Sequence, residues 1–518
     1  MLFMRRRFLL ALISGLFWAA LALPLGSQTP AAPQRPRLVL AIMVDQFRYD
    51  YLTRFGSEFN AGLKRLLTEG AVFTNANYDS APTVTAVGHG TFLTGATPSV
   101  SGIIGNDWWD RTANRRVQSI TDETVTTLGG SGAGASPRRL MVSTVGDELK
   151  ISGHGGKVIS VSLKDRSAIL PAGHMADGAF WFDTRTGNFA SSTYYFKSLP
   201  AWASEINLSH PADKYAGRQW RNQKMPAQPS LQLYAAVDST PFGDELVLDF
   251  ALRAMAVEKL GSGQKTDLLA VSFSSVDYVG HAFGPDSPEI HDMVVAVDKV
   301  IGQLLDAAER QAGPGNVVAV FSADHGVATI PAANIARNMP GGRTDSQAER
   351  AAVEQALRAR FGAGNYIAYF SETSMYFTAD PVPGKQLDRT EMQRVAAAVM
   401  RTQPHVMRVY TRTGLENGAA SGDVIDQRIR NGFHQERSGD VMIVHEPNWQ
   451  AGGSSANHGS PFSYDTHVPV IFLGPGRVKA GQYHGEAGIQ DIGPTLAQIL
   501  GIAAPTGSMG RVLGEVLP

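Results

Sequence analysis

The chain has 518 residues, of which 43% are hydrophobic and 18% are charged, and its formal net charge is −1. Such a composition is typical of a water-soluble protein, and the length suffices for one large domain with an insertion or for two domains. No block of Lys and Arg follows the first few residues, which argues against a nucleic-acid-binding surface. No cysteine occurs, which excludes disulfides and thiolate metal ligands.

The N-terminus has the pattern of a secretory signal peptide over residues 1–26. A basic start, Met1–Arg7, precedes the apolar run Phe8–Leu23, and small residues suited to cleavage follow. Residues 27–36 form a spacer rich in proline and alanine. We therefore expect export to the periplasm or the extracellular space. The apolar run is short for a membrane span, so we expect none unless the signal segment stays uncleaved.

Continuous apolar runs recur along the chain and predict buried strands at 37–45, 157–164, 267–277, 316–326 and 467–474. Continuous rather than alternating hydrophobicity is typical of strands covered on both faces, as in parallel sheets. Helical segments lie between them: one opens with Ser287 and Pro288, and another spans Asp491–Leu500. We predict an α/β fold with a doubly wound, mostly parallel sheet and helices on both faces, formed by residues 37–330 and 456–518.

Two stretches depart from this pattern. Residues 180–240 are rich in aromatic and turn residues, which favours a lid over the site, with an elaborate surface loop as the alternative. Residues 331–455 predict an inserted α+β subdomain. Its expected elements are helices at 346–361 and 390–402 and short strands at 374–378, 406–411 and 440–445.

Acidic and histidine side chains follow the ends of several of these strands. Carboxylate oxygen and imidazole nitrogen suit zinc, and open α/β sheets place their sites outside the carboxyl ends of their strands. Any one of these residues has an ordinary alternative role, as a helix cap or a packed histidine. Their joint pattern predicts a site for two divalent ions, which can clamp the attacking and leaving oxygens of a phosphoryl transfer. The candidates are Asp45, Asp277, His281, Asp324, His325 and His458.

A candidate nucleophile lies in the segment Pro82–Gly90, which opens a probable helix. The hydroxyl of Thr85 would meet the positive end of the helix dipole, with free N–H groups nearby for an anion. A zinc ion on the hydroxyl would favour the alkoxide. The alternative is that Thr85 only caps the helix.

The order of these residues resembles the alkaline phosphatase superfamily over most of residues 37–515. The segment Thr85–His89 is similar to the nucleophile segment of its nucleotide pyrophosphatase/phosphodiesterase and Thr-type phosphatase branches. The resemblance implies two Zn²⁺ ions and a covalent phosphothreonine intermediate. It also implies a ligand set for each ion: Asp45, Asp324, His325 and the Thr85 oxygen on the nucleophile side, and Asp277, His281 and His458 on the leaving-group side.

Three further residues favour a phosphate monoester over a diester. Lys164 and Arg166 sit at a strand end, and a monoester presents more terminal negative charge to such cations. Asn106 supplies an amide donor to the same phosphate. With Thr85, this set resembles the PafA-type zinc-dependent alkaline phosphatases of bacteria. The alternatives are a solvated strand end for the two cations and a turn role for Asn106.

Other features narrow the comparison within the superfamily. No Cys and no Pro/Arg-containing sulfatase motif is present, which argues against the formylglycine sulfatases. We find no ligand set for a third, magnesium ion. His89 and His467 lie in family-like segments, but we expect them to make local hydrogen bonds outside the metal sites.

Together these features predict zinc-dependent hydrolysis of small phosphate monoesters, with a broad substrate range and release of inorganic phosphate. The first alternative is a phosphodiesterase or nucleotide pyrophosphatase on the same two-zinc site. The second is a metal-stabilised binding protein without turnover. A monomer is compatible with the sequence, which leaves the oligomeric state open.

Overall fold

The centre of the fold is an 11-stranded sheet with the order β21-β2-β20-β13-β1-β12-β7-β8-β9-β5-β6. The computed structural model describes residues 35–371, 373–419 and 422–518, so the predicted signal peptide and nearly all of the spacer lie outside the described residues. The strands are β1 (Leu38–Val44), β2 (Ala71–Asn77), β5 (Thr121–Leu128), β6 (Ala133–Ala135), β7 (Gly155–Ser162), β8 (Gly178–Asp183), β9 (Asn188–Ser192), β12 (Thr266–Phe273), β13 (Val317–Ser322), β20 (Val470–Leu473) and β21 (Gly481–Gly488).

The middle of the sheet is parallel and its flanks are mixed. β13, β1, β12, β7 and β8 pair in parallel, each with the next. The predicted α/β fold is confirmed, but β20 runs antiparallel to both of its neighbours, β13 and β2. Its residues are all buried. Burial on both faces produces a continuous apolar run whatever the strand direction, so the run could not reveal the orientation of β20.

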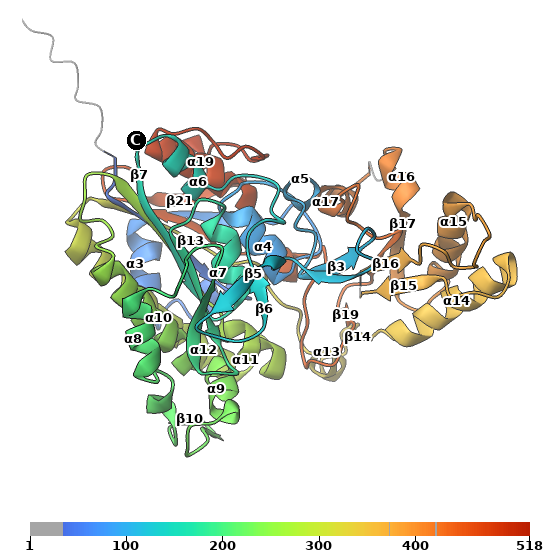
Figure 1. Cartoon of the computed structure of the whole chain (residues 1–518), viewed down its shortest axis with the longest axis horizontal. Helices are drawn as coiled ribbons and strands as arrows, with labels where there is room; N and C mark the ends of the chain where they lie inside the picture. The colour runs from blue at the N-terminus through green and yellow to red at the C-terminus, as the bar shows by residue number, and fades with distance from the viewer. Residues whose placement is uncertain (1–34, 372, 420–421) are drawn as a thin grey trace, which may run out of the picture. The chain divides into compact units, whose positions relative to one another are not determined.

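Helices cover both faces of the sheet (Figure 1). α7 (Asp165–Ala172) and α10 (Pro241–Val257) each pack against β7 and β12, and every residue of β12 is buried. α10 packs beside α12 (Pro288–Ala312), which in turn packs against α3 (Gly62–Glu69). On the other face, α7 packs beside α4 (Thr85–Phe92). The two layers enclose the main apolar core.

The start of α12 follows the predicted signals. The side chain of Ser287 accepts a hydrogen bond from Ile290 N at 3.2 Å, and Pro288 occupies the first turn, where its missing N–H costs nothing. Val294 and Ile301, which lie at helical spacing along α12, are buried. The last helix is α19 (Ile492–Leu500), as expected.

A second sheet is formed by residues after 331, with the order β15-β16-β18-β17. It has its own apolar core together with two helices. Figure 1 shows these elements in yellow and orange. They are β15 (Ile367–Phe370), β16 (Ser374–Phe377), β17 (Val406–Thr411), β18 (Val441–His445), α14 (Ser346–Phe361) and α15 (Arg389–Met400). All but β15, which was not expected, lie close to the predicted bounds. None of the described helices is both long and apolar enough to cross a membrane.

Candidate two-metal active site

The predicted ligands meet where three neighbouring parallel strands end. Asp45 directly follows β1, Asp277 lies in the first turn of α11 (Ser275–Phe283) after β12, and Asp324 follows β13. The register aligns these strands, because Val44 of β1 pairs with Phe273 of β12. Parallel neighbours in register bring the residues after their last pairs to one edge of the sheet.

On the nucleophile side, three ligand atoms converge in the interior. His325 Nε2 lies 3.5 Å from Asp45 Oδ1 and 3.5 Å from Asp324 Oδ2. All three side chains are fully buried, and none of these atoms has a hydrogen-bond partner among the described residues. Buried polar atoms are seldom left unpaired. Two carboxylate oxygens and an imidazole nitrogen left in this way fit a divalent cation such as zinc.

Electrostatics at this position also favour a cation. Burial, and next the charge of Asp45, hold the pKa of Asp324 well above its usual range. The raised pKa shows that ionising Asp45 and Asp324 together costs free energy unless a positive charge lies between them. A divalent ion would reverse this cost.

On the leaving-group side, Asp277 Oδ1 lies 3.2 Å from His281 Nε2 and 3.8 Å from His458 Nε2. Asp277 is also grouped with Asp45 and His325, with ligand atoms within 4.8 Å of one another. The sequence assigned Asp277 to one ion only, whereas the geometry places its carboxylate within reach of both positions.

Backbone carbonyls orient all three imidazoles. Nδ1 lies at hydrogen-bond distance from Ala456 O in His281 (2.8 Å), from Thr83 O in His458 (2.8 Å) and from Gly326 O in His325 (2.9 Å). Because a carbonyl can only accept, each Nδ1 carries a proton, and Nε2 of His325 and of His458 presents a lone pair to the cluster. This is the outer-shell arrangement that prepares histidine for metal binding. In His281, Nε2 faces Asp277 Oδ1 at 3.2 Å; burial opposes the charged form, but the charge of Asp277 raises the pKa of this imidazole to about 8, so a metal ion would displace that proton.

Thr85 is the first residue of α4, and Val84 is the residue that caps it. The alternative in which Thr85 serves as the cap is therefore wrong, and its side chain makes no hydrogen bond within the described residues. Gly88 explains why this helix lies so close to the ligands: a Cβ there would come within 2.4 Å of Asp324 O. The absence of a side chain at Gly88 lets the first turns of α4 pack directly on the Asp324 backbone.

The two histidines expected outside the metal sites make local hydrogen bonds. His89 Nε2 lies 2.8 Å from Ser272 Oγ, and its Nδ1 lies 2.9 Å from Thr85 O. His467 Nε2 lies 3.0 Å from Thr74 O.

Asn106 is tied to the same helix terminus. Its Oδ1 accepts a hydrogen bond from Ala86 N at 2.8 Å. This fixes the orientation of the amide, because the backbone N–H requires an acceptor. The NH₂ group of Asn106 makes no hydrogen bond within the described residues. It remains available to an anion beside Thr85.

Lys164 occupies an unexpected position. The sequence placed it at the phosphate, but its ammonium lies 2.6 Å from Asp45 Oδ2 and 2.6 Å from Asp277 Oδ2. Burial opposes the charged form, yet Asp277 and Asp45 raise the pKa of Lys164 above its ordinary value. The residue is 6% exposed, so the alternative of a solvated strand end is wrong for it.

Arg166 lies in the first turn of α7, the helix that packs against α4. Its Nε is buried and has no hydrogen-bond partner among the described residues. Within the described part of the chain, its guanidinium forms an ion pair only with Asp165 Oδ1, at 3.9 Å. A buried donor without a partner beside the Thr85 helix fits a role in binding phosphate oxygens.

Gln46 was missed by the sequence analysis. It is fully buried and has a φ of 60°, which is the left-handed region that glycine favours. Its backbone N–H donates to Asp324 Oδ1 at 3.0 Å and its side-chain Nε2 donates to Asp277 Oδ1 at 2.7 Å. One residue thus holds a carboxylate from each side of the cluster. Its only signal in the sequence was its place directly after Asp45.

A cavity of about 440 Å³ opens beside the leaving-group side of this cluster. His281, His458 and Asn106 line it from the main sheet, and Tyr376 and His445 line it from the second sheet. A second cavity, of about 450 Å³, is lined by Lys164, Arg166 and residues 181–185.

Comparison with known proteins places the chain in a family. The sequence model of the protein family described as type I phosphodiesterase / nucleotide pyrophosphatase matches residues 39–470. Alkaline phosphatase PafA of Elizabethkingia meningoseptica is 34% identical, with 95% of this chain and 96% of that protein covered. A Myroides odoratus protein named calcium-transporting ATPase is 35% identical, with 93% of this chain and 95% of that protein covered. The crystal structure of wild-type PafA matches with a TM-score of 0.86 at 32% identity, covering 94% of this chain and 100% of that one.

The fold and the Asp/His cluster at its strand ends define a member of the alkaline phosphatase superfamily, and the resemblance indicated by the motifs is confirmed. Within it, the chain belongs to the type I phosphodiesterase / nucleotide pyrophosphatase family.

Proposed function

We propose that this protein is an exported alkaline phosphatase that binds two zinc ions and hydrolyses small phosphate monoesters through a phosphothreonine at Thr85. The observation that carries the proposal is the setting of Thr85. Thr85 is the first residue of α4, and its hydroxyl makes no hydrogen bond within the described residues. Through Gly88, this helix packs on the Asp324 backbone. Beside it are three buried ligand atoms without partners. The similarity to alkaline phosphatase PafA over nearly the whole chain supports the same reaction class.

The six Asp and His residues and Thr85 would hold the ions. When bound, zinc would supply Lewis-acid stabilisation of the attacking and leaving oxygens. The Thr85 oxygen forms a bond to phosphorus while the bond to the leaving oxygen breaks, and water then cleaves the phosphothreonine to release inorganic phosphate. The amide of Asn106 and the guanidinium of Arg166 hold the non-bridging oxygens, on which charge is spread in the transition state.

Lys164 has a different part in this proposal from the one the sequence suggested. Its ammonium neutralises Asp45 and Asp277, both predicted metal ligands. From there it adds positive charge behind the phosphate and holds the two carboxylates in place. Arg166 and Asn106 then supply the direct contacts that favour a monoester.

The test combines zinc analysis with kinetics on a matched pair, p-nitrophenyl phosphate and methyl p-nitrophenyl phosphate. We expect two zinc ions per chain, a higher kcat/KM for the monoester, and loss of turnover in Thr85→Ala with zinc retained. Arg166→Ala should lower kcat/KM for the monoester more than for the diester.

Other results would favour the alternatives. A strong diester preference that survives Lys164→Ala and Arg166→Ala would establish the phosphodiesterase, the activity for which the matching family is named. An unchanged rate in Thr85→Ala would exclude the covalent mechanism. Two bound zinc ions with no turnover on either ester would establish a binding protein.

A further inference from the structure

The cavity of about 440 Å³ lies on one side of the cluster only. Its walls include His281 and His458, the ligands assigned to the leaving-group side, and Asn106. Asp45, Asp324 and His325 are not among its lining residues. In an in-line displacement the leaving group departs opposite the nucleophile. If the protein acts as proposed above, the cavity is where the alcohol of the substrate lies.

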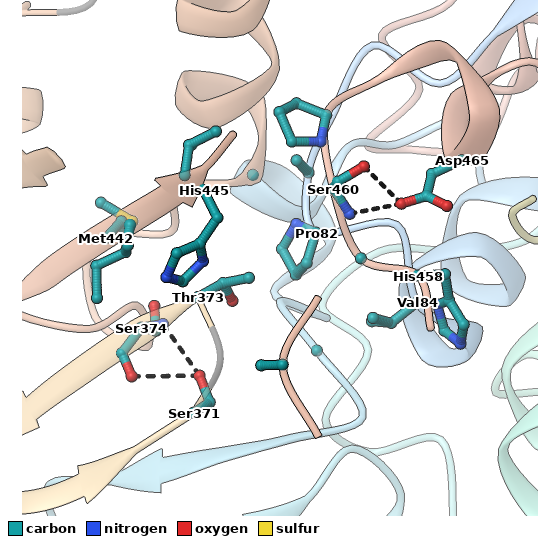
Figure 2. A pocket seen from close by; sticks show the side chains of 18 of the residues that line it. Pro82, Val84, Ser371, Thr373, Ser374, Met442, His445, His458, Ser460 and Asp465 are labelled. Atoms are coloured by element: carbon teal, nitrogen blue, oxygen red, sulfur yellow. Dashed lines mark hydrogen bonds between the residues drawn. The ribbon is translucent and has the colours of Figure 1, made fainter. Parts of the chain in front are cut away.

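The far wall carries a buried carboxylate–imidazole pair. His445, at the end of β18, lies with Nε2 2.9 Å from Oε1 of Glu349 on α14. Glu349 is 3% exposed, and its other oxygen has no hydrogen-bond partner among the described residues. Since an ionised carboxylate only accepts, Nε2 carries the proton of this bond. Figure 2 shows His445 on one side of the cavity and His458 with Val84 on the other.

This pair leaves one polar atom for a ligand. His445 Nδ1 makes no hydrogen bond within the described residues, although His445 lines the cavity. Held by Glu349, the imidazole cannot turn away without breaking its bond to a buried carboxylate. With the proton on Nε2, Nδ1 of the neutral imidazole accepts a hydrogen bond from a hydroxyl group.

The surrounding walls fit a ring. Tyr369 and Tyr376 lie together with ring centroids 5.8 Å apart, and both line the cavity with Met442 and Ile429. The rest of the lining is mixed, with polar residues such as Ser374 and Gln450 beside the apolar ones, and the volume lies in the usual range of small-molecule sites. Aromatic faces pack well against the C–H faces of a sugar-like ring.

We propose that this cavity is the leaving-group subsite and that His445, held by Glu349, binds a ring hydroxyl of the departing alcohol. The favoured substrates are therefore phosphate monoesters of hydroxylated ring alcohols, such as sugar phosphates. This inference rests on the proposed phosphatase activity and adds its substrate class.

The test uses two substrates of matched shape, glucose 6-phosphate and cyclohexylmethyl phosphate, which lacks the ring hydroxyls. The variant is His445→Phe/Glu349→Leu, because removing both partners leaves no unpaired buried charge. We expect kcat/KM to fall more for glucose 6-phosphate than for cyclohexylmethyl phosphate, by about 2- to 12-fold, the range of one net hydrogen bond. The matched control is His291→Phe/Glu58→Leu, which removes an exposed His–Glu pair (2.9 Å) from outside the cavity lining.

Each outcome has a defined meaning. Equal losses for the two substrates in a folded variant would overturn the subsite, because His445 would then act on something that both esters share. No loss for either would overturn it too. If the double variant does not fold, His445→Phe/Glu349→Gln leaves no buried charge and still lacks Nδ1, so the same differential loss is expected from it. Failure of the wild type on both substrates would instead contradict the phosphatase proposal itself.

Discussion

Substituting Gln46 separates two contacts that one residue makes with the predicted metal centre. The side-chain amide holds Asp277 at 2.7 Å, on the leaving-group side. The backbone N–H holds Asp324 at 3.0 Å, on the nucleophile side. In Gln46→Gly the first contact is lost and the second is kept. Because glycine adopts a φ of 60° freely, the backbone conformation at this position should persist.

The size of the effect follows from the role of the amide. Loss of a group that orients a metal ligand typically costs about 10- to 100-fold in metal affinity, or about 1.4–2.8 kcal/mol. We expect this loss at one of the two zinc sites, with the affinity of the other unchanged. Gln46→Ala should show the same loss of affinity. It should also unfold with a lower free energy than Gln46→Gly, by about 1 kcal/mol, because alanine is strained in the left-handed region.

The assay is zinc competition against a chromophoric chelator, which resolves two affinities without any measurement of turnover. Urea unfolding of the metal-free variants compares glycine with alanine. If both zinc affinities stayed at the wild-type value in Gln46→Gly, the amide would have no positioning role. Equal weakening of both sites would show a general loosening of the cluster instead.

Three further predictions follow from buried contacts. Lys164→Met removes the ammonium between Asp45 and Asp277, so the metal-free protein should lose about 3–5 kcal/mol of unfolding free energy. The zinc-loaded protein should lose less, and urea unfolding with and without EDTA measures both losses. Gly88→Ala should weaken zinc binding at the nucleophile-side site, measured by chelator competition, because its Cβ would meet Asp324 O at 2.4 Å. Gly453→Ala, where a Cβ meets nothing within 4 Å, is the control. Burial raises the pKa of Asp238 to about 8. Between about pH 4 and 8 the folded chain therefore binds more protons than the unfolded chain. The free energy of unfolding then falls as the pH rises through that window. Between pH 5 and pH 9, the unfolding free energy of Asp238→Asn should therefore rise relative to that of the wild type by about 4 kcal/mol, and a difference that does not depend on pH would contradict this account.

The candidate ligands could be found from the sequence because each lies where a local pattern changes. Asp45, Asp277 and Asp324 end or follow apolar runs, and parallel strands bring such ends to one edge. A local sequence pattern cannot predict which distant segments come into contact. The bond from Gln46 to Asp277 depends on a left-handed backbone at one strand end and a helix start at another. The pair of His445 and Glu349 joins two elements of the second sheet's layer in the same way.

Lys164 shows most clearly how such contacts alter an interpretation. A cation at a strand end, two residues before an arginine, predicts direct contact with phosphate as long as the neighbours are unknown. In the fold, the buried ammonium of Lys164 lies 2.6 Å from a carboxylate oxygen of Asp45 and 2.6 Å from one of Asp277, and these two ion pairs hold it in place. In the proposed reaction, the direct contacts that favour a monoester come from Arg166, whose buried Nε has no hydrogen-bond partner among the described residues, and from the amide of Asn106. It follows that Lys164→Ala should change zinc binding and phosphate binding together, whereas Arg166→Ala should change phosphate binding alone.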